Sequence, residues 1–134
     1  MSKVGFIGLG IMGKPMAKNL LKAGVELLVC DVNEEAVNEV RAAGASVGTY
    51  VEIGTECEVI FLILPNGEIS KAVLFADDGV ASTLTSGKIV CDMSSVTPVE
   101  SRECFEKLAE IGVGFVDAPV SGGEPGAING TLAF

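Results

Sequence analysis

Three closely spaced glycines near the start of the chain are the residues best suited to chemistry. Gly8, Gly10 and Gly13 stand two and three residues apart in GFIGLGIMGKPMAKNL, directly after a short apolar run. The first glycine allows a tight turn, the second lets a phosphate approach the backbone, and the third lets a helix pack close to a strand. Free N–H groups at a helix start attract anions. The predicted pyrophosphate contacts are Gly8, Leu9, Gly10, Ile11, Met12 and Gly13.

An acidic residue follows at the spacing of a dinucleotide site. Asp31 lies 18 residues after Gly13, at the end of the second apolar run. Its carboxylate can accept hydrogen bonds from the adenosine ribose hydroxyls. No Arg or Lys adjoins Asp31, so a 2′-phosphate would meet a carboxylate instead of a guanidinium. NAD is therefore favoured over NADP, and Arg41 is the residue that could shift this preference. The alternative is a plain turn, with Asp31 capping the next helix.

Short apolar runs and helix-like patterns alternate along the whole chain. We expect strands at 3–7, 26–30, 45–48, 58–64, 88–92 and 114–117, and helices at 11–23, 34–43, 67–75, 78–85 and 98–111. The strands are apolar throughout, as in a parallel sheet that helices cover on both faces. The pattern predicts one α/β domain over 1–134, with a doubly wound, mostly parallel sheet of the Rossmann type.

Two further segments are expected at the carboxyl edge of this sheet, where ligands bind in open α/β folds. Leu64 and Pro65 end the fourth expected strand, and Thr97 follows the fifth. These three residues are candidate cofactor contacts. The alternative is structural, because Pro65 can simply end a strand and Thr97 can cap the helix that Pro98 begins.

Composition excludes several functional classes. The chain carries 18 acidic and 9 basic residues, a net charge of −9, which disfavours a nucleic-acid partner. No apolar run is long enough to cross a membrane, and no secretory leader pattern opens the chain, so we expect a cytoplasmic protein. The chain has no histidine, and its four cysteines form no C-x-x-C pair. We therefore expect no metal site and no histidine-activated nucleophile.

A motif near the end of the chain carries a family resemblance. Residues 117–132 read DAPVSGGEPGAINGTL, and they accompany GFIGLGIMGKPMAKNLLKAG and DMSS. Together these segments resemble the β-hydroxyacid dehydrogenases, and within them the tartronate semialdehyde reductases (2-hydroxy-3-oxopropionate reductases) and 3-hydroxyisobutyrate dehydrogenases. The glycine fingerprint is common to many dehydrogenases, whereas the serine–glycine motif is specific to this family. The resemblance covers the whole chain.

The resemblance implies a substrate site at Ser121, Gly122 and Gly123, which would hold the carboxylate of a small hydroxy or oxo acid. A serine hydroxyl beside glycine N–H groups suits an anion. The alternative is a flexible Gly-Pro loop. The resemblance also implies that the segment from Gly8 to Met12 binds the pyrophosphate and Asp31 the adenine ribose. The nicotinamide half is then expected near Leu64, Pro65 and Thr97.

The same resemblance implies that the general acid/base lies outside this chain. Family members use a lysine in a second, all-helical domain, and none of the seven lysines here stands in a matching segment. We expect that lysine beyond Phe134, no catalytic residue within 1–134, and a chain that is inactive alone. Its expected partners are the helical domain, or another copy of the chain, and a small hydroxy or oxo acid.

The expected function is cofactor binding for hydride transfer between nicotinamide and a short 3-hydroxy acid or its semialdehyde, of the tartronate semialdehyde/glycerate type. One alternative is a non-catalytic NAD(H)-binding sensor or regulatory module. A second is an imine-reducing or 6-phosphogluconate-type enzyme of the same superfamily. Against this second alternative, the substrate loop carries only the acidic Glu124, where a phosphorylated substrate would need cations.

Overall fold

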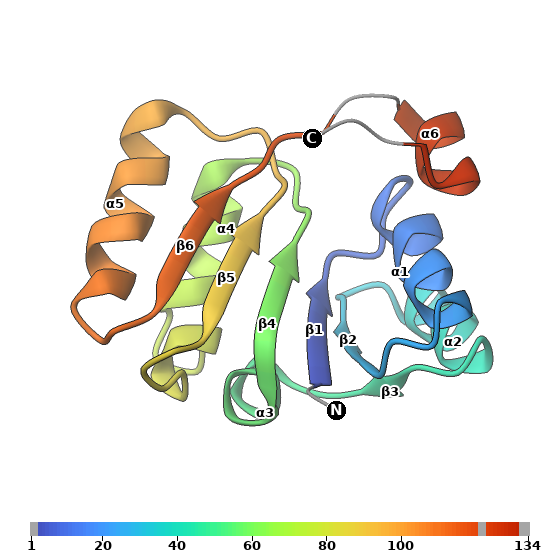
Figure 1. The fold of residues 1–134 in the computed structure, drawn as a ribbon, viewed down its shortest axis with the longest axis horizontal. Coiled ribbons are helices and arrows are strands. Elements are labelled where there is room, and N and C mark those ends of the chain that lie inside the picture. Colours follow the sequence, from blue (N-terminus) through green and yellow to red (C-terminus); the bar gives the residue numbers. More distant parts are fainter. Residues whose placement is uncertain (1–2, 121–122, 132–134) are drawn as a thin grey trace.

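The computed structural model describes residues 3–120 and 123–131, which form a parallel β-sheet with helices on both faces (Figure 1). The six strands follow the order β3-β2-β1-β4-β5-β6, and every neighbouring pair is parallel. They are β1 (Lys3–Ile7), β2 (Leu27–Cys30), β3 (Ser46–Val47), β4 (Cys57–Leu62), β5 (Ile89–Asp92) and β6 (Gly114–Asp117). The predicted doubly wound sheet is confirmed.

The helices divide between the two faces because the chain adds β2 and β3 on one side of β1 and then β4, β5 and β6 on the other. The helices are α1 (Gly13–Lys22), α2 (Glu34–Ala42), α3 (Tyr50–Glu56), α4 (Gly67–Phe75), α5 (Pro98–Ala109) and α6 (Gly123–Asn129), with a 3₁₀ turn, η1 (Val80–Ser82). Right-handed crossovers place α1 and α2 on one face and α4 and α5 on the other. Strand order therefore reverses between β1 and β4, and loops at their carboxyl ends diverge to leave a crevice.

Local capping explains where most helices begin. The Asn33 side chain accepts hydrogen bonds from the first-turn N–H groups of α2, and Asn66 does the same for α4. Thr97 accepts from the Glu100 N–H, and the Glu100 carboxylate accepts from the Thr97 N–H, which makes a capping box for α5. The α2 and α5 caps confirm the starts that the sequence predicted.

Three segments differ from the sequence prediction, one of them the helix α6, which we did not predict. Residues 50–56 form α3, which we did not predict, although Thr49 and Glu52 make a second capping box there. The helix predicted over 78–85 is wrong, because only Val80–Ser82 are helical and in 3₁₀ form. The Thr83 hydroxyl donates to the Val51 carbonyl of α3, at 2.8 Å, so contact with α3 replaces a continued helix.

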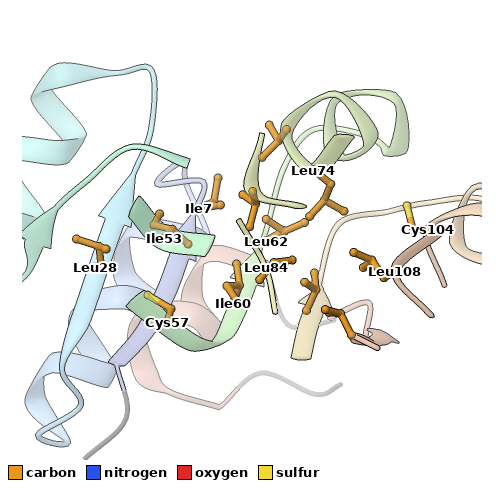
Figure 2. Packing of buried hydrophobic residues seen from close by; sticks show 14 residues of the cluster. Ile7, Leu28, Ile53, Cys57, Ile60, Leu62, Leu74, Leu84, Cys104 and Leu108 are labelled. Carbon is orange, nitrogen blue, oxygen red and sulfur yellow. The ribbon is translucent and has the colours of Figure 1, made fainter. Parts of the chain in front are cut away.

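The core consists of one apolar cluster on each side of the sheet. Figure 2 shows the larger one, in which Ile60 and Leu62 of β4 lie among side chains of the covering helices, including Leu74 and Leu108. The other cluster joins Phe6 of β1 to residues of α1 and α2. Both faces of the central strands are therefore buried, as their unbroken apolar runs predicted. In the part of the chain described, no helix is long and apolar enough to cross a membrane.

Candidate cofactor site

A cavity of about 510 Å³ lies at the carboxyl ends of β1 and β4, where the strand order reverses. This is the position at which doubly wound sheets bind dinucleotides. The structure brings most of the predicted site residues together around it. Those that line the cavity are Gly8, Gly10, Ile11, Met12, Gly13, Asp31, Leu64 and Pro65.

Glycine stands at these three positions for different structural reasons. Gly8 has φ +105°, and a Cβ there would overlap the Ile63 carbonyl oxygen. A Cβ on Gly13 would overlap the Gly8 carbonyl oxygen and would lie 2.9 Å from Cγ2 of Ile63. A Cβ on Gly10 would meet no atom of the chain within 4 Å. Packing therefore requires Gly8 and Gly13, whereas at Gly10 the missing side chain leaves open space beside the cavity.

The start of α1 suits a negatively charged group. Met12 occupies the N-cap position, and its side chain makes no capping hydrogen bond in the described structure. Lys14 donates its N–H to the Gly10 carbonyl at 3.0 Å and Pro15 has no N–H, so the Gly13 N–H is the first-turn donor left for another acceptor in the described structure. The helix dipole adds a favourable field for an anion. This arrangement matches the pyrophosphate of a dinucleotide.

Two lysines of α1 form ion pairs with α2. Lys18 and Lys14 approach the Glu39 carboxylate at 2.6 and 3.3 Å. The hydrogen bond from Lys18 is the main cause that holds the pKa of Glu39 below its ordinary value, with Lys14 contributing. These ion pairs link α1 to α2, so one carboxylate offsets part of the charge of Lys14 and Lys18.

Asp31 connects the glycine loop to the end of β2. Its Oδ2 accepts a hydrogen bond from the Leu9 N–H at 2.6 Å, and its Oδ1 accepts from the Asn33 N–H at 2.8 Å. The Leu9 side chain is buried, so Leu9 acts on the loop through this N–H and does not line the cavity. Each carboxylate oxygen has a second lone pair, which leaves acceptors for ribose hydroxyls. The sequence predicted Asp31 as a ribose acceptor but not as an anchor of the glycine loop.

Tyr50 is a cavity residue that the sequence analysis missed. It opens α3 and lines the cavity, together with Ile69 and Val73 of α4. Burial, with smaller contributions from Cys30 and Asp31, raises the pKa of Tyr50. The phenol is therefore neutral at physiological pH and contributes mainly apolar surface. The capping-box spacing from Thr49 to Glu52 was the available signal for this helix.

Of the other predicted residues that the structure describes, Thr97 and Gly123 do not line the cavity. Thr97 caps α5 with its hydroxyl and is not among the lining residues. Ser121 and Gly122 lie outside the residues that the structure describes, and Gly123 begins α6 with φ +58°. The Gly-Pro segment after Gly123 is thus helical. The Asn19 amide donates to the Ala127 carbonyl at 2.7 Å, and this bond holds α6 against α1 (Figure 1).

Comparison with known families agrees with this geometry. Residues 3–134 match the family model described as the NAD binding domain of 6-phosphogluconate dehydrogenase. The chain belongs to this family of NAD-binding domains, which the β-hydroxyacid dehydrogenases share. The family resemblance inferred from the sequence is therefore confirmed.

Individual relatives narrow the comparison. The chain is 40% identical to 2-hydroxy-3-oxopropionate reductase of Escherichia coli (strain K12) over 132 residues, 98% of this chain and 45% of that protein. It is 45% identical to 2-(hydroxymethyl)glutarate dehydrogenase of Eubacterium barkeri over 133 residues, 98% of this chain and 44% of that protein.

A solved structure of a relative gives the same fold. The 3-hydroxyisobutyrate dehydrogenase of Mycobacterium tuberculosis, solved with L-serine, superimposes with a TM-score of 0.92 at 32% identity. The match covers 100% of this chain and 45% of that protein. The NAD-binding domain described here therefore spans less than half the length of the relatives that it matches.

Proposed function

We propose that this chain is the cofactor-binding domain of an NAD(P)-dependent oxidoreductase that acts on a short 3-hydroxy acid or its semialdehyde. One observation carries the proposal: the glycine turn after β1 is fastened by the 2.6 Å hydrogen bond from the Leu9 N–H to Asp31, at the strand-order switch point. That constellation positions both halves of an adenosine diphosphate site on rigid elements. Bound nicotinamide would supply the hydride chemistry.

Different segments of the chain bind different parts of the cofactor. The loop from Gly8 to Gly13 and the start of α1 bind the pyrophosphate, and Asp31 accepts hydrogen bonds from the adenine ribose. The apolar wall opposite the glycines, which includes Pro65 and Val73, then covers the nicotinamide half and excludes water from it. Thr97 stays a predicted contact from the neighbouring loop after β5.

The surroundings of Asp31 favour NAD over NADP. A second groove beside Asp31 is lined by Glu34, Asn38 and Arg41, so a 2′-phosphate would face two carboxylates there. The Arg41 guanidinium donates to Oδ1 of Asn38 at 2.5 Å, and this bond occupies part of its fork of donors. A guanidinium free to bind a 2′-phosphate is the usual requirement for NADP.

The substrate proposal rests on the relatives and on the motif after β6. The relatives' names describe reductases and dehydrogenases of small hydroxy and oxo acids. We assign Ser121, Gly122 and Gly123 to the substrate carboxylate on the family motif. Among the described residues that line the cavity, the titratable side chains are Asp31 and Tyr50, and none is a lysine. We therefore propose that the general acid/base comes from the helical domain of the intact enzyme or from a partner copy.

Cofactor titration tests the proposal. Calorimetry and nicotinamide fluorescence should give saturable binding of NADH to the 134-residue chain, with weaker binding of NADPH. Asp31→Ala should lower the affinity for both NADH and NADPH, because the glycine loop loses its anchor. It should also reduce the ratio of the NADH affinity to the NADPH affinity. Asp31→Asn is the matched control for charge, because its amide oxygen can still accept from the Leu9 N–H. Absence of binding at millimolar NADH and NADPH refutes the proposal.

A turnover assay tests the catalytic part separately. The chain should not oxidise NADH measurably with 2-hydroxy-3-oxopropionate. A positioned acid/base typically raises the reaction rate by about 10²- to 10⁴-fold. The proposed substrate motif also forms only one side of a substrate pocket, so the substrate would not be held in an aligned geometry. A longer chain that includes the helical domain is the positive control. Comparable turnover by the two chains would show that the acid/base lies within residues 1–134.

A further inference from the structure

Three buried polar side chains lie behind the Leu64–Pro65 wall of the cavity. Ser70 of α4, Asp92 at the end of β5 and Ser94 just after it are each at most 2% exposed. Buried polar groups are costly unless they are hydrogen-bonded, so a cluster of three beside a binding cavity requires a physical reason.

Ser94 is the centre of this cluster. Its Oγ accepts a hydrogen bond from the Leu64 N–H at 2.7 Å and lies 3.3 Å from Oγ of Ser70. Its own N–H donates to Oδ1 of Asp92 at 2.9 Å. The cluster therefore joins the ends of two strands to helix α4.

The bond from Leu64 replaces the sheet ladder at the point where the ladder ends. The last backbone bond between these two segments runs from the Met93 N–H to the Leu62 carbonyl, at 2.7 Å. On the other side, the Ile63 N–H donates to the Ile7 carbonyl of β1 at 3.0 Å. Beyond these bonds, the Ser94 hydroxyl holds the backbone that carries Leu64 and Pro65 into the cavity.

Hydrogen bonds satisfy only one of the two oxygens of Asp92 in the described structure. Its Oδ2 is buried without a hydrogen-bond partner in the described structure, while Oδ1 fixes the Ser94 backbone. A buried polar atom without a hydrogen-bond partner lowers stability, so it requires an explanation other than the stability of the cluster. The cluster is therefore poorly explained as a stabilising feature and better explained by what it positions.

We propose that Ser94 is a positioning residue for the nicotinamide half of the cofactor, and that Asp92 and Ser70 hold Ser94 in place. This inference rests on the proposed function. With the pyrophosphate on the glycine loop and the adenine ribose at Asp31, the nicotinamide half must extend across the crevice to the β4 side. Leu64 and Pro65 form that side, and the Ser94 hydroxyl sets where their backbone lies.

The test compares two ligands that differ only in the nicotinamide end. Ser94→Ala should weaken NADH binding about tenfold, whereas the affinity for ADP-ribose, which lacks nicotinamide, should stay within about twofold. The enhancement of nicotinamide fluorescence on binding should also fall. Ser82→Ala is the control, since its hydroxyl donates a hydrogen bond of 2.7 Å to the Gly79 carbonyl, in the η1 turn. That control should change neither affinity.

Ser70→Ala provides a second variant that leaves the bond between Ser94 and Leu64 intact. It should weaken NADH binding by about threefold without changing the affinity for ADP-ribose. If Ser94→Ala does not fold, this variant tests the positioning role of Ser94 in its place. Equal losses for both ligands, or no loss for either, would overturn the positioning role. If the unaltered chain binds neither ligand, the proposed function fails and this inference fails with it. If it binds both, only the role of Ser94 is at issue.

Discussion

Replacing Gly10 by alanine should separate cofactor binding from folding. The new Cβ would meet no atom of the chain within 4 Å, and Gly10 is exposed with a φ that other residues adopt. The free energy of unfolding should therefore stay the same or rise by up to about 1 kcal/mol, because alanine reduces the entropy of the unfolded chain. The Cβ instead occupies the space where a pyrophosphate would approach the loop.

The expected loss of affinity follows from the hydrogen bonds that this displacement breaks. A hydrogen bond from a backbone N–H to a charged phosphate contributes about 1.5–3 kcal/mol, which corresponds to about 10- to 150-fold in the dissociation constant. Calorimetric titration with NADH, together with urea unfolding of the same samples, measures both quantities.

Gly13→Ala is the contrasting variant. Its Cβ would overlap the Gly8 carbonyl oxygen and crowd Ile63, so α1 must move away from β1. Overpacking of this kind costs about 1–3 kcal/mol or more, and the loss should appear in the unfolding curve. If Gly10→Ala binds NADH as tightly as the unaltered chain, the pyrophosphate does not lie on this loop. If Gly10→Ala instead unfolds as easily as Gly13→Ala, the assignment of separate roles to the glycines is wrong.

Two further predictions concern stability. Lys88→Met should lower the free energy of unfolding by about 2–4 kcal/mol and leave NADH affinity unchanged, because the buried Nζ donates to the Gly54 and Thr55 carbonyls at 2.7 and 2.9 Å, at the end of α3. Lys22→Met, on an exposed helix end, is the control, and equal urea midpoints for the two variants would contradict the argument. Burial raises the pKa of the Cys57 and Cys104 thiols from 9.0 to about 11. As the pH rises, these thiols therefore lose their protons in the unfolded chain before they do so in the folded chain. The free energy of unfolding should consequently fall as the pH rises from about 9 to 11. Urea unfolding from pH 8 to 11 should give a loss of about 1–3 kcal/mol per thiol, and a variant with alanine at both positions that falls equally would refute that cause.

Local sequence signals were sufficient for the parts of the fold that depend on neighbouring residues. The glycine spacing predicted the turn between β1 and α1, because a positive φ at Gly8 and the close approach at Gly13 are steric requirements. Asn33 and Thr97 predicted helix starts, since caps bind N–H groups two or three residues away. The alternation of strands and helices then predicted the sheet, because parallel strands need crossovers.

Tertiary contacts decide the structure of the segment after Gly79, which the sequence predicted as a helix, whereas α3 carries a local signal in its capping box. Residues 80–83 pack on α3, and a hydrogen bond from Thr83 to Val51, 32 positions earlier in the chain, ends the short 3₁₀ turn. The periodicity of a ten-residue window cannot predict a contact between residues so far apart in the sequence. The placement of Tyr50 in the cavity has the same origin, since it depends on how α3 meets β1 and β2.

The sequence by itself determined which residues could form an NAD site, since glycine sterics, an acid after β2 and helix caps act over a few bonds. Only the tertiary structure decided how they are held. The bond from Leu9 to Asp31 spans 22 positions and the bond from Leu64 to Ser94 spans 30, so each forms only after the strands have paired. Strand order is the physical reason, because it brings the ends of β1, β2, β4 and β5 to one edge, where side chains distant in sequence can bind the same loop.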